Sequence, residues 1–184
     1  MVNKLFGIFV CLMMLFSGNT SAQIFMSETS YVRFFSSAPL ENIEAINKQA
    51  KAAADFDKKT FSVRIPVKSF VFEKDLMQEH FNENYMESEK FPNAVFKGVL
   101  KGDINLAKDG VYQLTASGEA DIHGVKKNYE IPVKMTVKNG EVETESVFKV
   151  KLADHKIEIP TMVFKKIAEE VEVTVKMKML QNKK

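Results

Sequence analysis

The chain lacks most of the residues that carry covalent or metal chemistry. Its 184 residues include no Trp, three His and a single Cys, Cys11. One Cys cannot form an intramolecular disulfide, and it excludes a multi-cysteine metal site. The chain also has no large excess of charge of either sign, since 26 basic and 24 acidic side chains leave a net charge of +2. This balance gives no electrostatic reason to expect nucleic acid or an anionic membrane as partner.

Catalytic motifs are absent as well. The sequence has no phosphate-binding glycine loop, nucleophile elbow or cluster of metal ligands. Its histidines, His80, His123 and His155, stand far apart. We expect each to form ordinary hydrogen bonds, and we expect no catalytic residue, metal or cofactor. An enzyme that acts on a lipid through His80 or His123 is kept as an alternative.

The first 22 residues have the pattern of an export signal. Lys4 is followed by an apolar run at 5–16 (LFGIFVCLMMLF) and by small and polar residues at 17–22 (SGNTSA). A basic start, an apolar run of about 7–15 residues and a small-x-small end define a secretory signal peptide, whereas a membrane span needs about 20 apolar residues. We expect cleavage after Ala22, which removes Cys11. One mature domain, 23–184, would then be exported to the periplasm or secreted.

Alternation of apolar and polar residues dominates the rest of the chain. Apolar side chains at every second position are typical of strands with one buried face. The sequence predicts strands at 30–37, 60–71, 96–106, 111–123, 129–137, 142–152 and 171–179. Asn139-Gly140 is a dipeptide that two-residue hairpin turns prefer. Apolar spacings of three and four residues predict helices at 40–54 and 74–86.

Seven or eight long antiparallel strands with only two helical insertions favour a closed barrel. A flat sheet of this size would leave its apolar face uncovered, and closure removes both that face and the sheet edges. The alternate positions are charged, for example Lys101, Glu119, Lys134, Glu143 and Lys176. A membrane barrel would need apolar residues there. The prediction is therefore a soluble all-β barrel of about eight strands, without a membrane span.

Five small residues fall on the predicted inner face of two adjacent strands. They are Gly98, Gly102, Ala116, Gly118 and Ala120. Glycine within a strand marks a bend or a close approach, and an eight-stranded barrel can hold one small ligand. The small residues therefore either let the sheet curl or leave an apolar cavity, and both interpretations are kept. If they shape a cavity, Ala116→Phe or Gly118→Leu would block ligand uptake and leave the fold intact.

Two segments carry a resemblance to a known family. Residues 77–81 (MQEHF) with 85–96 (YMESEKFPNAVF) and residues 118–127 (GEADIHGVKK) are similar to the helix and the hairpin motifs of the YceI-like family. A weaker similarity begins at Phe148. Ala120 and Asp121 depart from the family's usual Leu-Thr, and a helical lysine- and alanine-containing stretch is expected where many members have a shorter loop. The resemblance implies an exported, lipocalin-like antiparallel barrel whose pore holds a polyisoprenoid, an isoprenoid quinone or a fatty-acid derivative.

We therefore expect a carrier, store or sensor of one apolar, lipid-like molecule. The predicted pore lining consists of Phe61, Ile65, Phe96, Leu100, Leu114, Ile131, Met135, Phe148, Val173 and Met177, with room left by Gly98, Ala116 and Gly118. Phe81, Met86 and Phe91 are the predicted mouth. The alternative from another class is a barrel with a filled core that acts as an interaction or stress-related module. A homodimer is left open.

Overall fold

The computed structural model describes residues 23–160 and 167–182, and the predicted signal peptide at 1–22 lies outside this part. The strands are β1 (Ile24–Ser37), β2 (Asn42–Asn47), β3 (Lys51–Asp55), β4 (Thr60–Pro66), β5 (Val71–Phe72), β6 (Asn93–Lys101), β7 (Gly110–Ile122), β8 (Val125–Lys138), β9 (Glu141–Lys151) and β10 (Glu170–Gln181). The helical segments are η1 (Val67–Ser69), α1 (Asp75–His80), η2 (Phe81–Tyr85) and η3 (Leu152–His155).

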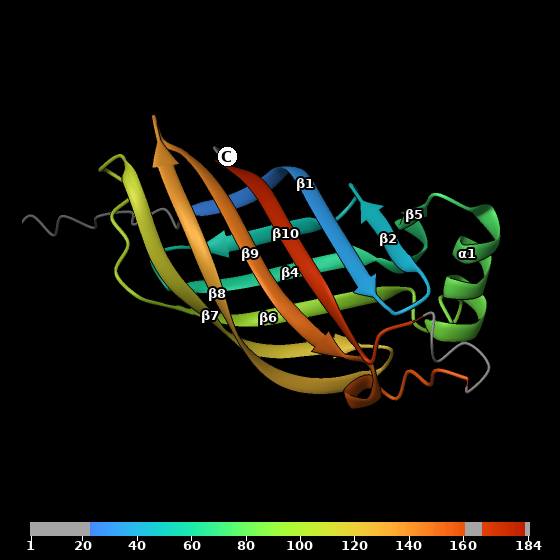
Figure 1. Ribbon diagram of the computed structural model, residues 1–184. Coiled ribbons are helices and arrows are strands. Elements are labelled where there is room, and N and C mark those ends of the chain that lie inside the picture. Colours follow the sequence, from blue (N-terminus) through green and yellow to red (C-terminus); the bar gives the residue numbers. More distant parts are fainter. Residues whose placement is uncertain (1–22, 161–166, 183–184) are drawn as a thin grey trace, which may run out of the picture.

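The strands form one antiparallel sheet that closes on itself. Their order is β10-β9-β8-β7-β6-β4-β3-β1-β2-β5, and an additional β10–β1 pairing completes the circle (Figure 1). β2 and β3 pair with successive parts of β1 and together occupy the position of one strand in the barrel wall. β5 pairs with β2 at the rim. The result is an eight-stranded barrel, and the predicted all-β, lipocalin-like fold is confirmed.

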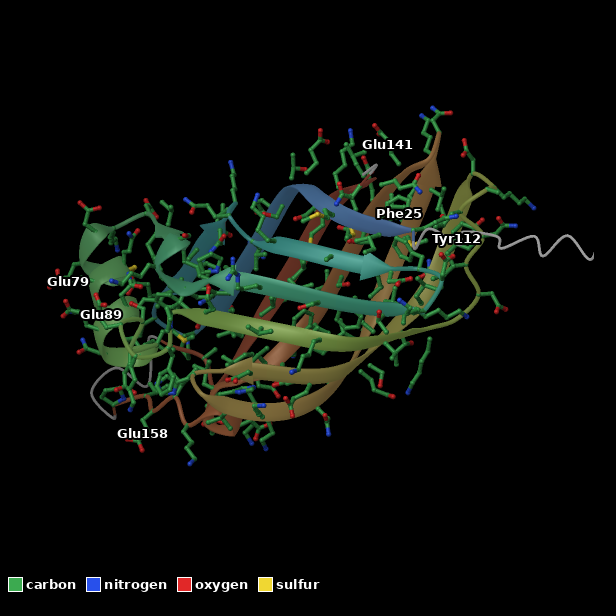
Figure 2. All side chains as sticks on the ribbon, turned by 180° about the vertical axis from the view of Figure 1, so that it is seen from behind. Phe25, Glu79, Glu89, Tyr112, Glu141 and Glu158 are labelled. Atoms are coloured by element: carbon green, nitrogen blue, oxygen red, sulfur yellow. The ribbon has the colours of Figure 1, made fainter. Side chains whose placement is uncertain are left out.

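The two ends of the barrel differ. The connections 38–41, 67–92 and 123–124 and the segment 152–160 meet at one end, which we name the helix end because it carries α1 (Figure 1). The connections 56–59, 102–109 and 139–140 meet at the other, which we name the turn end. Figure 2 shows Glu79 and Glu89 at the helix end and Phe25 and Tyr112 at the turn end.

The predicted helix at 40–54 is wrong, because this segment is β2 and β3. Its alanines and its three- and four-residue spacings suit a helix, but pairing with β1 decides the conformation. Ala45 lies opposite Phe34 and Ala54 opposite Phe25, and both alanines are buried. The chain bends between the two strands, where the backbone N–H of Gln49 donates to the Asn47 side chain. The predicted helix at 74–86 is confirmed as α1 and η2.

The remaining predicted strands are confirmed with changed ends. The strand expected at 60–71 stops at Pro66, and the one expected at 96–106 stops at Lys101, because Gly102 takes a φ of +124° and turns the chain. The first strand begins six residues earlier than expected, at Ile24. Asn139 and Gly140 both have positive φ, 52° and 79°, as the predicted two-residue hairpin turn requires.

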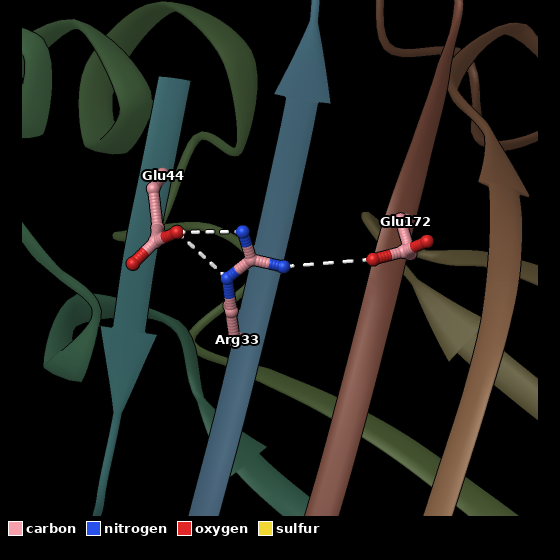
Figure 3. A network of polar contacts seen from close by, with 3 residues as sticks. All are labelled: Arg33, Glu44 and Glu172. Atoms are coloured by element: carbon pink, nitrogen blue, oxygen red, sulfur yellow. Dashed lines mark hydrogen bonds and ion pairs between the residues drawn. The ribbon is translucent and has the colours of Figure 1, made fainter. Parts of the chain in front are cut away.

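A polar contact on the outer face ties the closing strands together. The Arg33 guanidinium on β1 donates to Glu44 of β2, with Nε 2.7 Å and Nη2 2.6 Å from Oε2 (Figure 3). Its Nη1 lies 3.5 Å from Oε1 of Glu172 on β10, and the guanidinium also lies over the Phe35 ring at 4.5 Å. Arg33 therefore joins β1 to the strand on each side of it.

Candidate functional site

The turn end of the barrel is filled by apolar side chains. Phe25 and Phe56 meet edge to face with ring centroids 5.1 Å apart. Met135 and Val142 are fully buried (0% exposed), and Met179 is nearly so at 4%. Close packing of this kind leaves no space for a ligand. We name these five residues the plug.

Away from the plug, the inner wall carries large apolar side chains that are only half-buried. They are Phe61, Ile65, Phe96, Phe148 and Val173. Phe61 and Phe96 still contact each other, with ring centroids 4.9 Å apart. In a barrel filled by its own side chains, inward-facing residues would be as buried as the plug. These side chains are less buried than the plug, and we name the part of the barrel interior that they face the lumen.

Most of the predicted pore lining lies in one apolar cluster. Its members are Phe61, Ile65, Phe81, Phe96, Leu100, Leu114, Ala116, Ile131, Met135, Phe148, Val173 and Met177. Met135 belongs to the plug, and Leu100, Leu114, Ala116, Ile131 and Met177 are also buried. The side chains that border the lumen are therefore the half-buried members, those of β4, β6, β9 and β10.

Gly98 and Gly118 allow two strands to approach each other and do not enlarge the lumen. They lie opposite one another in the β6–β7 pair. A Cβ on Gly118 would lie 2.1 Å from the carbonyl oxygen of Lys97, and one on Gly98 would lie 2.1 Å from that of Ser117. The expectation that Gly118→Leu would leave the fold intact is wrong, because the new side chain would collide with backbone atoms.

Four aromatic rings cover the helix end. Phe81 stacks on Phe34 at 5.4 Å and contacts Phe72 at 5.0 Å and Phe70 at 5.6 Å. Sequence reasoning placed Phe81 at a mouth but missed the other three. Phe34 lies in a predicted strand, and the alternation of Phe70 and Phe72 beyond Pro66 was the available signal.

The other two predicted mouth residues lie in different places, one beside the aromatic cover and one at the turn between β7 and β8. Met86 packs with Val67 and Ile157 in a second small cluster, and Phe81 of the aromatic cover also packs against this cluster. The Phe91 ring meets the edge of His123 with centroids 4.7 Å apart, at the turn between β7 and β8. Met86 therefore adjoins the aromatic cover through Phe81, whereas Phe91 contacts His123.

The barrel wall divides between β8 and β9. Their ladder ends at the pair Lys134–Glu145, although β8 continues to pair with β7 and β9 with β10. Between residues 125–133 and 146–151, all within the described chain, no ladder is formed. The strands separate there toward the helix end (Figure 1).

A histidine network bridges this division. His155 of η3 is fully buried (0% exposed), and the Tyr129 hydroxyl of β8 donates to its Nε2 at 2.7 Å. Its Nδ1 donates to the Val125 carbonyl at 3.2 Å, and its own carbonyl accepts from His123 Nδ1 at 3.0 Å. Burial lowers the pKa of His155 and raises the pKa of Tyr129. His123 Nε2 in turn lies 2.8 Å from Glu87 Oε2.

His123 and His155 therefore have structural partners. Both ring nitrogens of His123 have hydrogen-bond partners, the His155 carbonyl at Nδ1 and the Glu87 carboxylate at Nε2. His80 is exposed on α1. Within residues 23–160 and 167–182, no three His, Cys, Asp or Glu side chains gather as metal ligands. In the same part of the chain, no helix has the length and apolar character to cross a membrane.

A groove of about 450 Å³ lies on the outer face, between β2, β5 and α1. Its lining includes Phe35, Ile46 and Met77 together with charged residues such as Glu44 and Lys74. Three exposed apolar side chains belong to the same region: Leu40 (66%), Val71 (64%) and Leu76 (60%).

Comparison with known proteins identifies the relatives of this fold. The YceI-like domain family matches residues 25–179. A polyisoprenoid binding domain from Saccharophagus degradans, implicated in plant cell wall breakdown, has 15% identity and a TM-score of 0.72, with 86% of this chain and 98% of that domain covered. Burkholderia cenocepacia BcnA has 18% identity and a TM-score of 0.67, with coverage of 81% and 95%. The Campylobacter jejuni YCEI protein has 18% identity and a TM-score of 0.53, with coverage of 68% and 74%. No match is found among curated proteins.

Proposed function

Because the chain belongs to the YceI-like family, we propose that its barrel binds one long apolar molecule in the lumen. The single observation that carries this proposal is the half-buried state of Phe61, Phe96, Phe148 and Val173 on the inner wall. Apolar surface beside water-accessible space is stabilised when an apolar ligand covers it. Each methylene moved from water into such a site contributes about 0.8 kcal/mol, so a long chain binds tightly without many polar contacts.

The ligand class that we propose is a polyisoprenoid, an isoprenoid quinone or a fatty-acid derivative. The described activity of the Saccharophagus degradans domain, polyisoprenoid binding, supports the first of these. The protein would act as a carrier, store or sensor without catalysis, since His123 is held by the His155 carbonyl and Glu87, and His80 is exposed on α1. The pattern of residues 1–22 supports export to the periplasm or secretion.

The absence of Trp from the chain allows a direct test. Phe148→Trp places a single Trp on the inner wall, and Val147→Trp places one on the neighbouring outward position, where Val147 is 47% exposed. Titration with phytol, a branched C20 alcohol, should shift the emission of Phe148→Trp to shorter wavelength and leave that of Val147→Trp unchanged. Equal responses, or none in either variant, would contradict a ligand in the lumen.

A filled-core interaction module is the second candidate function. The outer groove between β2, β5 and α1, with Val71 and Leu76 exposed beside it, is the observation that favours it. Exposed apolar surface of this kind marks interaction sites. If phytol does not shift the emission of the Phe148→Trp variant and the purified protein carries no small molecule, this module is favoured over the ligand-binding barrel.

A further inference from the structure

Three hydroxyl-bearing side chains stand among the apolar residues of one inner wall. Met177 on β10 pairs with Ser30 of β1 on one side and with Thr144 of β9 on the other. Two residues before Met177 on β10, at the next position on the same face, Val175 pairs with Ser146 of β9. Since residues paired across antiparallel strands point to the same face, Ser30, Thr144 and Ser146 share the inward face of Met177. We name them the hydroxyl row.

The fold does not use these hydroxyls. Ser27 and Ser36 accept hydrogen bonds from backbone N–H groups, and Asn47 donates to the Pro66 carbonyl. No side-chain hydrogen bond of Ser30, Thr144 or Ser146 is formed within the described residues, and the one buried side-chain atom there without a partner is Asn82 Oδ1. The hydroxyls of the row are therefore unpaired but not sealed in. Their side chains point into the barrel, and Thr144 lies opposite Met135 of the plug.

The inner wall beside the hydroxyl row has no charged side chain that could pair with a charged ligand group. Among the inward register positions of the described strands, only Lys127 is charged, and it lies at the helix-end rim, exposed and 3.7 Å from Asp154. A buried phosphate or carboxylate without a paired cation is strongly unfavourable. Hydroxyls can both donate to and accept from an uncharged oxygen group.

We propose that the hydroxyl row receives an uncharged oxygen group, a hydroxyl or a carbonyl, on the apolar ligand. This inference rests on the proposed function and narrows it. The barrel selects an apolar chain that ends in an alcohol, ketone, ester or amide over the bare hydrocarbon, and it excludes the corresponding phosphate from the lumen.

The test compares three compounds with the same chain: phytol, phytane and phytyl phosphate. Dissociation constants are measured through the Phe148→Trp emission, with each compound delivered from cyclodextrin. One added hydrogen bond predicts that phytol binds about 5-fold more tightly than phytane, and phytyl phosphate should bind more weakly than phytol. The combined variant Ser30→Ala, Thr144→Val and Ser146→Ala should remove the preference for phytol. Thr174→Val, on the outward face of β10, should retain it.

The outcomes separate this inference from the function on which it rests. Equal affinities for phytol and phytane, a preference that survives in the triple variant, or phosphate binding as tight as alcohol binding would overturn the hydroxyl row as a recognition site. Failure of all three compounds to bind would overturn the proposed function itself. If the triple variant does not fold, Ser146→Ala alone should reduce the phytol-to-phytane ratio, and an unchanged ratio would count against the inference.

Discussion

Removal of one hydroxyl, in Tyr129→Phe, tests how the divided wall is held. The Val125 carbonyl can only accept a hydrogen bond, so Nδ1 of His155 carries the hydrogen and Nε2 is the acceptor for the Tyr129 hydroxyl. The substitution keeps the stacked ring, whose plane lies 7° from that of the imidazole. It leaves Nε2 without a partner in a residue that is 0% exposed.

The size of the effect follows from that burial. An unsatisfied buried polar atom costs about 1–3 kcal/mol, whereas an ordinary hydrogen bond contributes about 0.5–1.5 kcal/mol. We expect Tyr129→Phe to lower the free energy of unfolding by about 2 kcal/mol. Tyr112→Phe is the matched control, because its hydroxyl reaches the Asn105 and Lys108 carbonyls at 2.8 Å at the exposed turn end. It should cost less than about 1 kcal/mol.

Urea unfolding of the three proteins near pH 8, where His155 is neutral in both states, gives the comparison. The reasoning is refuted if Tyr129→Phe changes the unfolding free energy by less than about 0.5 kcal/mol, or if the two variants are equally destabilised. In either case, burial of His155 would not control the strength of this contact.

Three further predictions concern stability. Because burial lowers the pKa of His155 from 6.5, the unfolded chain binds a proton that the folded chain does not, so stability is lost as pH falls below 6.5, by up to about 1.4 kcal/mol per pH unit. Unfolding measured between pH 5 and 8 should show this slope reduced in His155→Gln. Gly118→Ala, whose Cβ would lie 2.1 Å from Lys97 O, should cost about 3 kcal/mol in urea unfolding, while Gly110→Ala, with its nearest contact at 3.8 Å, should stay near wild type. Arg33→Met should cost about 1 kcal/mol, and that loss should shrink in 1 M salt, since its partners Glu44 and Glu172 are half-exposed.

Local alternation was enough to predict the wall of the barrel. Strands such as β7 and β9 were placed to within one residue, because a two-residue period is fixed by the neighbours along the chain. The segment 40–54 was mistaken for a helix because its inward side chains, Ala45, Ala52 and Ala54, are small and carry weak patterning. Its conformation depends on pairing with β1, a contact that lies outside any local window.

The candidate site was predictable in part for the same reason. Alternation identifies which side chains face inward, including Phe148 and Val173, but not which of them lie beside open space. That distinction depends on the plug, which uses Phe56 from a connection, and on the return of residues 67–92 over the helix end. The same return places Phe91 against His123 and leaves Met86 beside Phe81. Likewise, the sequence alone does not tell whether Gly98 and Gly118 mark a bend or a cavity. The distance to the backbone of the opposite strand decides this.

Native mass spectrometry of the protein purified without detergent tests the central claim most directly. We expect a population heavier than the bare chain by the mass of one uncharged, lipid-sized molecule, which is released on denaturation and can be extracted into organic solvent. A single species at the bare mass, together with no uptake of phytol by the Phe148→Trp variant, would contradict a ligand-binding lumen.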